Sequence, residues 1–204
     1  MTEKILKNNQ AVVAGEVVSD FEFSHEVFGE GFYLVKLKVS RLSHSSDIIP
    51  LLISERLIDV SQSCVGRFME ARGQFRSYNK HENNRNHLVL SLFVRELEML
   101  DVLDNRKPNM IFLDGYICKE PVYRTTPLGR EIADVLLAVN RAYSKSDYIP
   151  CICWGRIQSR EYQKKISEDN VISRIAYEVS VNKMEYCDDG MSLEGKVADS
   201  GNIS

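Results

Sequence analysis

The chain of 204 residues repeats part of its own sequence at an offset of 100 residues, and this repeat limits the possible folds more than any other feature. Between residues 9 and 50, the positions identical to those 100 residues later are Asn9, Gly15, Gly29, Val35, Leu37, Val39, Arg41, Ser46, Asp47, Ile49 and Pro50. Each copy is shorter than 100 residues, about the size at which a small domain closes its own core. The sequence therefore predicts two copies of one small domain.

The domain boundaries follow from where the repeat begins and where the composition changes. We expect a first domain over residues 5–103, a linker over 104–108 and a second domain over 109–187. The last segment, 188–204, is rich in Gly, Ser and Asp and poor in apolar residues, which predicts a disordered tail.

Alternation of apolar and polar residues indicates strands in both copies. The expected first strand covers residues 9–18 and 109–118, the second covers 33–39 and 135–139, and the third opens at 47–50 and 147–150. Gly15 and Gly115 lie inside the first strands, where a small barrel needs a bend or a close backbone approach.

The first copy continues with a weakly apolar stretch, residues 54–64, which we interpret as a helical turn. Residues 67–78 and 87–97 then form the expected fourth and fifth strands, joined by a polar hairpin. Five short strands with a helix between the third and fourth follow the order of an OB-fold barrel. The predicted fold class is therefore all-β with a short helix, arranged as two tandem OB-fold barrels.

The second copy is shorter than the first. Asp47 and Gly73 are 26 residues apart in the first copy, whereas Asp147 and Gly155 are 8 residues apart, so 18 residues are missing. We assign the loss to the helix and the beginning of the fourth strand. Whether the second barrel closes is left open by the sequence.

The shortening also has consequences for packing. An unbroken strand over residues 147–165 would be about 60 Å long at about 3.3 Å per residue, so we expect it to bend near Gly155. We further expect the second domain to be the less stable one, with its apolar side chains only partly covered. The side chains in question are Ile152, Ile157, Ile175 and Val179.

Composition indicates an ordinary soluble protein, with 44% hydrophobic and 27% charged residues. The chain has no apolar run of membrane-spanning length and begins with polar residues, which predicts a cytoplasmic, nucleoid-associated location and no membrane contact. Its five cysteines, two of them separated only by Ile152, suit reduced thiols better than disulfides or a zinc site. We expect no metal and no cofactor.

Catalytic motifs are absent from the sequence. It contains no Gly-rich phosphate loop ending in Lys-Ser or Lys-Thr, no His-Glu-x-x-His and no Gly-x-Ser-x-Gly. The adjacent carboxylates Asp188 and Asp189 lie in the expected tail, where nothing would hold them in register for acid–base chemistry. We therefore expect that the protein is not an enzyme.

Several short sequence motifs of the second copy resemble those of bacterial single-stranded DNA-binding proteins, and specifically of their tandem clostridial version. The motifs are Asn109-Met-Ile-Phe-Leu-Asp-Gly115, Thr126-Pro-Leu-Gly-Arg-Glu-Ile132, Leu137-Ala-Val-Asn-Arg141, Asp147-Tyr-Ile-Pro-Cys-Ile-Cys-Trp-Gly-Arg156 and Gln158-Ser-Arg-Glu-Tyr162. Through the internal repeat the resemblance extends over residues 9–187. It implies an OB-fold that stacks bases on aromatic side chains while Lys and Arg contact phosphates.

The resemblance implies a set of site residues, most of them in the second copy. The aromatic positions there are Tyr143, Tyr148, Trp154 and Tyr162, and the cationic ones are Arg141, Arg156, Arg160 and Lys164. The first copy has Ile48 and Ser54 where the second has Tyr148 and Trp154, which predicts a weaker or non-binding first barrel. Its remaining candidates are Phe75 and Tyr78 for stacking and Arg41, Arg76 and Lys80 for phosphates.

Two alternatives remain open for these residues. Aromatic side chains in small β domains often belong to the core, and cations on strands often serve only to block edge pairing. The net charge of −3 also argues against a nucleic-acid partner. The rival prediction is an OB-fold module that only assembles proteins.

The resemblance further implies sequence-tolerant single-stranded DNA binding in replication, repair or recombination, as a homodimer that brings four barrels around the strand. Family members commonly recruit replication or repair proteins through an acidic tail with an apolar tip. This sequence ends in Ser200-Gly-Asn-Ile-Ser204, which does not have that pattern.

Overall fold

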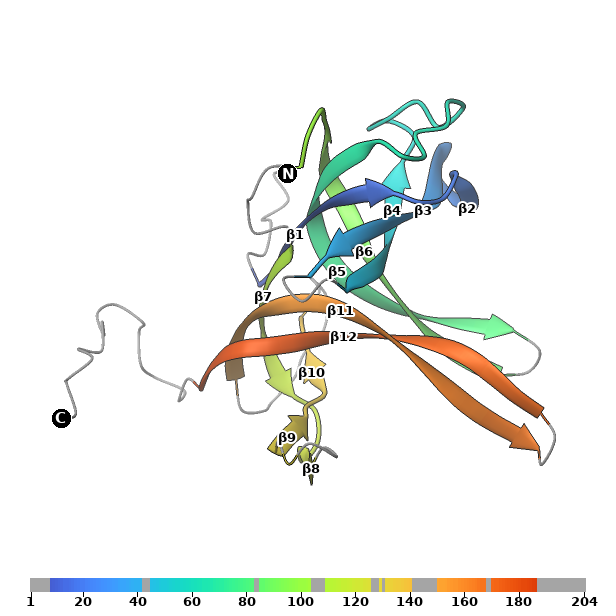
Figure 1. Ribbon diagram of the computed structural model, residues 1–204. Coiled ribbons are helices and arrows are strands. Elements are labelled where there is room, and N and C mark those ends of the chain that lie inside the picture. Colours follow the sequence, from blue (N-terminus) through green and yellow to red (C-terminus); the bar gives the residue numbers. More distant parts are fainter. Residues whose placement is uncertain are drawn as a thin grey trace, which may run out of the picture.

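A computed structural model describes residues 8–41, 45–82, 85–103, 109–125, 129, 131–140, 150–167 and 170–186. Within these ranges the protein consists of strands and turns, with no helix, and so with none that could cross a membrane. The strands are β1 (Asn9–Val17), β2 (Glu22–Val27), β3 (Glu30–Ser40), β4 (Ser46–Ser54), β5 (Phe68–Glu82), β6 (Arg85–Leu100), β7 (Asn109–Ile117), β8 (Val122–Thr125), β9 (Glu131–Asp134), β10 (Leu137–Ala138), β11 (Pro150–Ser167) and β12 (Asn170–Tyr186). We call β1–β6 the first unit and β7–β12 the second unit (Figure 1).

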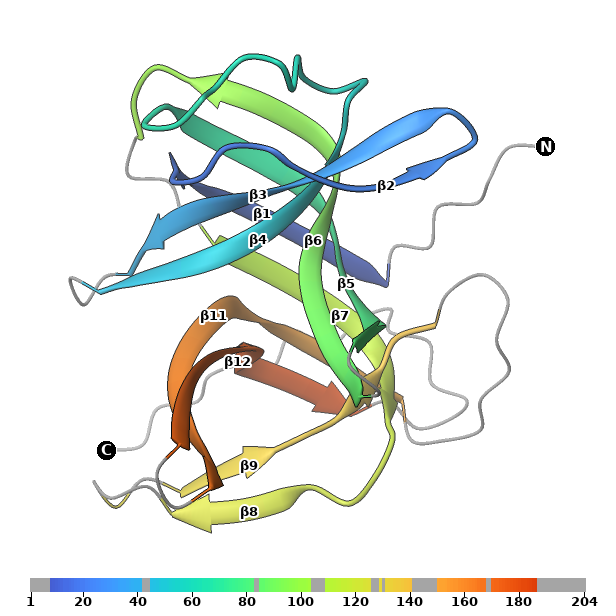
Figure 2. The ribbon, with the colours of Figure 1, turned by 90° about the vertical axis from the view of Figure 1, so that its right-hand side faces the viewer.

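The first unit contains a closed five-stranded barrel. Strand β1 pairs with both β3 and β5, β3 pairs with β4, β5 pairs with β6, and a parallel pairing of β4 with β6 completes the ring. Figure 2 shows this ring above the second unit. The connectivity is that of the OB-fold, which confirms the predicted architecture for this unit.

The barrel interior is filled by alternate side chains of its strands. On β4 the inward residues Ile49, Leu51 and Ile53 are each 0% exposed. They pack in one cluster with Leu37 of β3 and Leu92 of β6. Each such side chain contributes about 1.5–3 kcal/mol by leaving water, so β4 supplies a large part of the closure of this barrel.

The predicted helix over residues 54–64 is wrong. The segment forms a series of turns, with hydrogen bonds from Leu57 N to the Ser54 carbonyl and from Gln62 N to the Asp59 carbonyl. The Asp59 carboxylate also accepts bonds from the Ser61 and Gln62 side chains. Local side-chain bonds of this kind compete with helix formation, and the apolar face was too weak to overcome them.

The glycines that recur in the first strands have the same structural role in both units. A Cβ on Gly15 would lie 2.2 Å from the Lys38 carbonyl oxygen, and one on Gly115 would lie 2.3 Å from the Ala138 carbonyl oxygen. Neither contact leaves room for a side chain. This confirms the prediction of a close backbone approach at both positions.

The repeated asparagines also have matching contacts. Asn9 accepts a hydrogen bond from Phe75 N at 2.9 Å and donates to the Phe75 carbonyl, and Asn109 makes the same pair of bonds with Ile157 at 2.9 and 2.5 Å. Phe75 and Ile157 each lie two residues beyond a glycine, Gly73 or Gly155. Each asparagine therefore connects the start of one strand to the middle of another at the same point of the fold.

Strand register shows which part of the second unit is missing. Gly155 of β11 pairs with Ile111 as Gly73 of β5 pairs with Ala11, and both glycines adjoin a register irregularity with the next strand. Strand β11 is thus the counterpart of β5, and β12 is the counterpart of β6. The irregularity between Trp154 and Gly155 agrees with the expected bend near Gly155.

The expected third strand at residues 147–150 is therefore wrong at Pro150, the one residue of this range that the structure describes. Pro150 pairs with Tyr116 as Phe68 pairs with Glu16, so it begins the fourth strand of the unit and not the third. Between Ala138 and Pro150 the chain has 11 residues, against 29 between Lys38 and Phe68. The shortening falls on the region of the third strand and the turns after it, so the assignment of part of the loss to the beginning of the fourth strand is wrong. No described strand takes the place of β4.

The two units share one sheet and one core. Strand β1 pairs with β7, with Ala11 opposite Ile111. Ile111 and Ile157 belong to the same buried cluster as the first barrel. Ile157 is 0% exposed, so the expectation of partial cover is wrong for this residue, whereas Ile175 is 50% exposed as expected. Val179 is partly buried, also as expected, and the Ile152 side chain lies outside the description.

Candidate nucleic-acid interface

The outward side chains of β3, β4, β5 and β6 form one continuous surface of the first barrel, which we call the outer face. Because Val35 and Leu37 of β3 point into the core, Phe32, Lys36 and Lys38 point outward. Pairing of β3 with β4 and of β4 with β6 brings β3 and β6 close to each other on this surface. In OB-folds this is the side that binds oligonucleotides and oligosaccharides.

Three rings stack across the outer face. His25 of β2 lies 5.2 Å from Phe32, centroid to centroid, with 11° between the ring planes. Phe32 lies 5.9 Å from Phe93 of β6, with 29° between the planes. We call these three residues the aromatic row. Both phenylalanines are partly exposed, so the row presents ring surface to the solvent.

Two arginines flank the end of the aromatic row. The Arg76 guanidinium carbon lies 4.2 Å from the Phe93 ring centroid, and that of Arg95 lies 4.9 Å from it. Each is within the range of a cation–π contact. The exposed Lys36 and Lys38 project from β3 on the same face. Aromatic rings bordered by cations are the arrangement that binds single-stranded nucleic acid, with stacking for bases and charge for phosphates.

Of the predicted residues in the first unit, Arg76 lies on the outer face and Phe75 does not. Phe75 packs against the hydrophobic core, because successive residues of a strand point to opposite sides. It is therefore not a candidate for stacking. Tyr78 and Lys80 lie on β5 opposite Val89 and His87, and the description of these residues stops at the backbone.

Arg41 joins the two units instead of facing solvent as a free cation. Its guanidinium donates two hydrogen bonds to the Asp47 carboxylate, one of them 2.7 Å long, and a third bond of 3.2 Å to the Ser159 carbonyl of β11. Ser159 N donates to Asp47 at 2.7 Å, and Ser159 Oγ accepts from Ile48 N at 3.0 Å. This network fixes β11 against the start of β4.

The Asp47 carboxylate is fully enclosed in this network. Burial acts to raise its pKa, but the hydrogen bonds from Arg41 and Ser159 and the Arg41 charge outweigh burial, so the pKa lies below the usual Asp value. The same hydrogen bond with Asp47 raises the pKa of Arg41. The pair is therefore ionised at neutral pH, and Arg41 has a structural partner that a phosphate would have to displace.

In the second unit, Arg160 and Tyr162 lie next to each other on β11. The Arg160 guanidinium carbon is 6.0 Å from the Tyr162 ring centroid, Arg160 Nε is 3.9 Å from Glu178, and Tyr162 is 37% exposed. The predicted residues Trp154, Arg156 and Lys164 also lie on β11, but only their backbone is described. Arg141, Tyr143 and Tyr148 lie outside the described residues.

The aromatic row has no equivalent at matching positions of the second unit. Gly73 pairs with Val94 and Gly155 with Val181, so the counterpart of Phe93 is Ser180. By the same register the counterpart of Arg76 is Gln158. Phe32 and Phe93 were not among the residues predicted from the sequence. Phe93 stands within residues 88–94, which are apolar except for Ser91, so alternation is hidden and its outward orientation had no clear signal.

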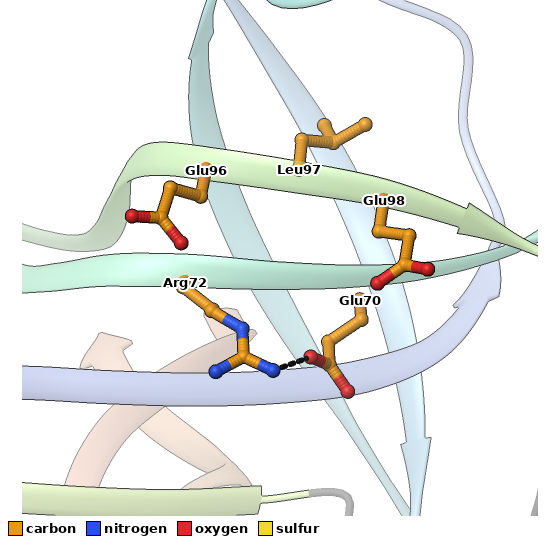
Figure 3. Close-up of a pocket in the computed structure, with 5 residues that line it drawn as sticks. All are labelled: Glu70, Arg72, Glu96, Leu97 and Glu98. Atoms are coloured by element: carbon orange, nitrogen blue, oxygen red, sulfur yellow. Dashed lines mark hydrogen bonds and ion pairs between the residues drawn. The ribbon is translucent and has the colours of Figure 1, made fainter.

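A second part of the outer surface is acidic. Beyond the register shift at Gly73, a pocket on β5 and β6 is lined by Glu70, Arg72, Glu96, Leu97 and Glu98 (Figure 3). Glu70 faces Glu98 and Arg72 faces Glu96 across the strands, and Arg72 bonds Glu70 at 2.5 Å. Glu70 is nearly buried and paired with Arg72, so Glu96 and Glu98 are the exposed carboxylates of this pocket. They repel phosphates, and this surface therefore limits the candidate interface to the side that carries the aromatic row.

The described residues contain no group of three or more His, Cys, Asp or Glu side chains able to hold a metal ion. A closed OB barrel with exposed rings and flanking arginines defines a class of protein, an OB-fold binding protein.

Comparisons with known proteins identify the family. The sequence profile of the family described as "Single-strand binding protein family" matches residues 108–172. Single-stranded DNA-binding protein 1 of Staphylococcus aureus is 31% identical over 83 residues, which cover 28% of this chain and 50% of that protein. Single-stranded DNA-binding protein B of Bacillus subtilis is 30% identical over 83 residues, covering 28% of this chain and 74% of that protein.

The chain belongs to the single-strand binding protein family, although it spans only about half the length of the Staphylococcus aureus relative. This is a family of binding proteins, and the chain is not an enzyme. The crystal structure of the wild-type single-stranded DNA binding protein from Thermus aquaticus has the same fold, with a TM-score of 0.62 at 14% identity, over 92% of this chain and 96% of that one.

Proposed function

We propose that the protein binds single-stranded DNA with little sequence preference and that the outer face of the first unit is its main binding surface. The observation that carries this proposal is the aromatic row of His25, Phe32 and Phe93 with Arg76 and Arg95 beside it. Bases stack on the phenylalanine rings, and phosphates follow the arginines and the lysines of β3. Stacking tolerates any base because every base has a π-face.

The free energies expected from stacking and from counterion release support these separate roles for the rings and the cations. Stacking contributes about 1–3 kcal/mol per base, so two rings can supply a substantial part of a micromolar affinity, which corresponds to about 8 kcal/mol. The remainder comes from release of counterions by the cations. The net charge of −3 does not prevent this, because carboxylates such as Glu70, Glu96 and Glu98 gather on another part of the surface.

The relatives support the choice of ligand. The Staphylococcus aureus and Bacillus subtilis proteins are named as single-stranded DNA-binding proteins. We extend the proposal to a role in DNA replication, repair or recombination at the nucleoid, carried out by a homodimer. Tyr162 and Arg160 are exposed on β11 and extend the proposed path of the DNA to the second unit. The other residues predicted to contact DNA in this unit are Arg141, Tyr143, Tyr148, Trp154, Arg156 and Lys164.

A titration with labelled oligo-dT of about 30 nucleotides tests the proposal. We expect binding that weakens by at least tenfold between about 50 mM and about 200 mM salt, because several phosphates lose their counterions. Phe93→Ala should weaken binding at both salt concentrations, whereas Arg95→Gln should also reduce the salt dependence. Absence of binding, or affinity that does not change with salt, would contradict the proposal.

The acidic surface around Glu70, Glu96 and Glu98 favours the rival function, an assembly module for proteins. The same titration separates the two functions. A wild-type chain that does not bind oligo-dT at low salt, either by anisotropy or by quenching of its lone Trp154, supports the assembly module.

A further inference from the structure

The β2–β3 hairpin ends in an unusual turn. Val27 pairs with Glu30, so the turn has two central residues, Phe28 and Gly29. Both have positive φ angles, 52° and 76°. Type I′ turns require this conformation at both positions and strongly favour Asn-Gly or Asp-Gly. Figure 2 shows the hairpin projecting from the edge of the barrel.

Phe28 makes this turn less stable than Asn or Asp would at the same position. A bulky side chain in the left-handed region is an outlier that costs free energy. The Phe28 side chain is also 104% exposed, so burial within the chain does not offset that cost. Strained and exposed residues of this kind concentrate at functional sites.

The hairpin connects Phe28 to the aromatic row. His25 on β2 pairs with Phe32 on β3, and their rings stack on the outer face. Val27, two residues after His25, lies on the same side of the hairpin and is 43% exposed. Partly or fully exposed apolar and aromatic side chains therefore run from Phe93 through Phe32, His25 and Val27 toward the tip, which carries Phe28.

The charges near the tip are compatible with a polyanion. Glu30 is held by Arg56, whose nitrogen lies 3.2 Å from it, and by the Ser54 hydroxyl. Glu26 pairs with Gly31 and lies on the side of the hairpin opposite His25. A strand of nucleic acid that follows the aromatic row thus passes from His25 to Phe28 beside Glu30, whose charge is offset by Arg56.

We propose that Phe28 is a base-stacking residue that holds the single strand where it leaves the aromatic row. This inference rests on the proposed function. The left-handed turn directs the ring into solvent, where a base can cover it. Removing the ring costs affinity, and replacing it with a residue suited to the turn relieves strain.

Phe28→Asn tests this prediction in the full chain, with labelled oligo-dT as the probe. We expect affinity to fall about fivefold or more, the lower end of the effect of losing one stacked base. The slope of affinity against salt should not change, because Phe28 contacts no phosphate. The melting temperature should stay the same or rise, because Asn adopts the left-handed conformation readily.

Three further variants sharpen the test. Phe28→Tyr keeps a ring and should bind like the wild type, whereas Phe28→Leu keeps an apolar side chain without a ring and should bind like Phe28→Asn. Phe23→Ser is the matched control, because Phe23 is 57% exposed on the other side of the hairpin, against Tyr33. Its affinity should equal that of the wild type.

The outcomes distinguish this inference from the function on which it rests. If the wild type binds oligo-dT and Phe28→Asn binds equally well, Phe28 does not stack on DNA while the proposed function stands, and the tip is left for contact with a protein. If Phe28→Leu retains full affinity, the contact is apolar and not a stack. If the wild type does not bind, both the function and the inference are wrong.

Discussion

The two units have the same framework but differ in how completely they enclose their core. Gly15 and Gly115, and Asn9 and Asn109, make equivalent contacts at equivalent points. Yet Val94 of the first unit is 3% exposed, whereas its counterpart Val181 is 44% exposed. Strand β4 pairs with β6 and closes the first unit, and no described strand pairs with the outer edge of β12. The repeated glycines and asparagines thus specify where neighbouring strands approach each other. Strand β4, which has no described counterpart in the second unit, decides whether the barrel closes.

The units also differ in which of them resembles the family and which carries the aromatic row. The family profile matches residues 108–172, in the second unit. The row of His25, Phe32 and Phe93 lies in the first unit, where the sequence predicted the weaker face. Similarity to the family in sequence motifs and the presence of the aromatic row are therefore separate properties of this chain.

The largest expected effect concerns the stability of the two cores. Leu92→Ala should destabilise the protein by about 2–5 kcal/mol, because it leaves a cavity at a side chain that is 0% exposed. Val181→Ala should change stability by no more than about 0.5 kcal/mol, since that side chain is already half in solvent. Urea unfolding measures both, and equal losses would mean that the second core is closed in solution.

The next effect concerns binding. Phe93→Ala should cost about 1–3 kcal/mol in affinity for oligo-dT, and Tyr162→Ala in the second unit should cost less, because Tyr162 has one arginine near its ring and no stacked aromatic neighbour among the described residues. Fluorescence anisotropy at a single salt concentration measures both. A larger loss of affinity for Tyr162→Ala would mean that the main binding surface lies in the second unit, as the motifs that resemble the family predict.

Amide hydrogen exchange offers a smaller but more local comparison. Leu51 and Leu52 of β4, which pair with β3 on one side and β6 on the other, should exchange at least about tenfold more slowly than residues 175–181 of β12, a difference of about 1.4 kcal/mol in opening free energy. The control is residues 111–113 of β7, which lie in the shared core. Equal protection of β4 and β12 would show that another chain or segment covers the β12 edge.

Much of the framework could be predicted from the sequence because it depends on local geometry. A glycine repeated inside a strand, such as Gly15 and Gly115, indicates a close approach wherever it occurs, and alternation identifies β1 and β3. The bend near Gly155 followed from strand length alone. These features need no knowledge of distant contacts.

Other features could not be predicted because tertiary contacts decide them. Pro150 ends the motif 147–150, whose counterpart 47–50 opens the third strand of the first unit, yet pairing with Tyr116 places Pro150 in the fourth strand. Phe75 and Phe93 are both aromatic residues of long strands, and only packing against the core distinguishes the inward ring of Phe75 from the outward ring of Phe93. Arg41 was predicted as a phosphate contact, and its pairing with Asp47 depends on the fold of β4.

The smallest expected effect is a pH dependence of the contact between the units. Asp47 has a lowered pKa in the folded state, so it stabilises the protein above its unfolded pKa of about 3.9, and this contribution is lost as the pH falls through the folded value. Protonation removes the charge that holds Arg41 and Ser159 against β4, so β11 should loosen before the first barrel unfolds. Hydrogen exchange at Ser159 and its neighbours should therefore become faster, after correction for the intrinsic rate, on going from pH 6 to below about pH 3.5. Asp47→Asn keeps the shape of the side chain without its charge, and in this variant exchange at Ser159 should already be fast at pH 6 and change little on acidification. If acid loosened Asp47→Asn as strongly as the wild type, a carboxylate other than Asp47 would control the contact between the units.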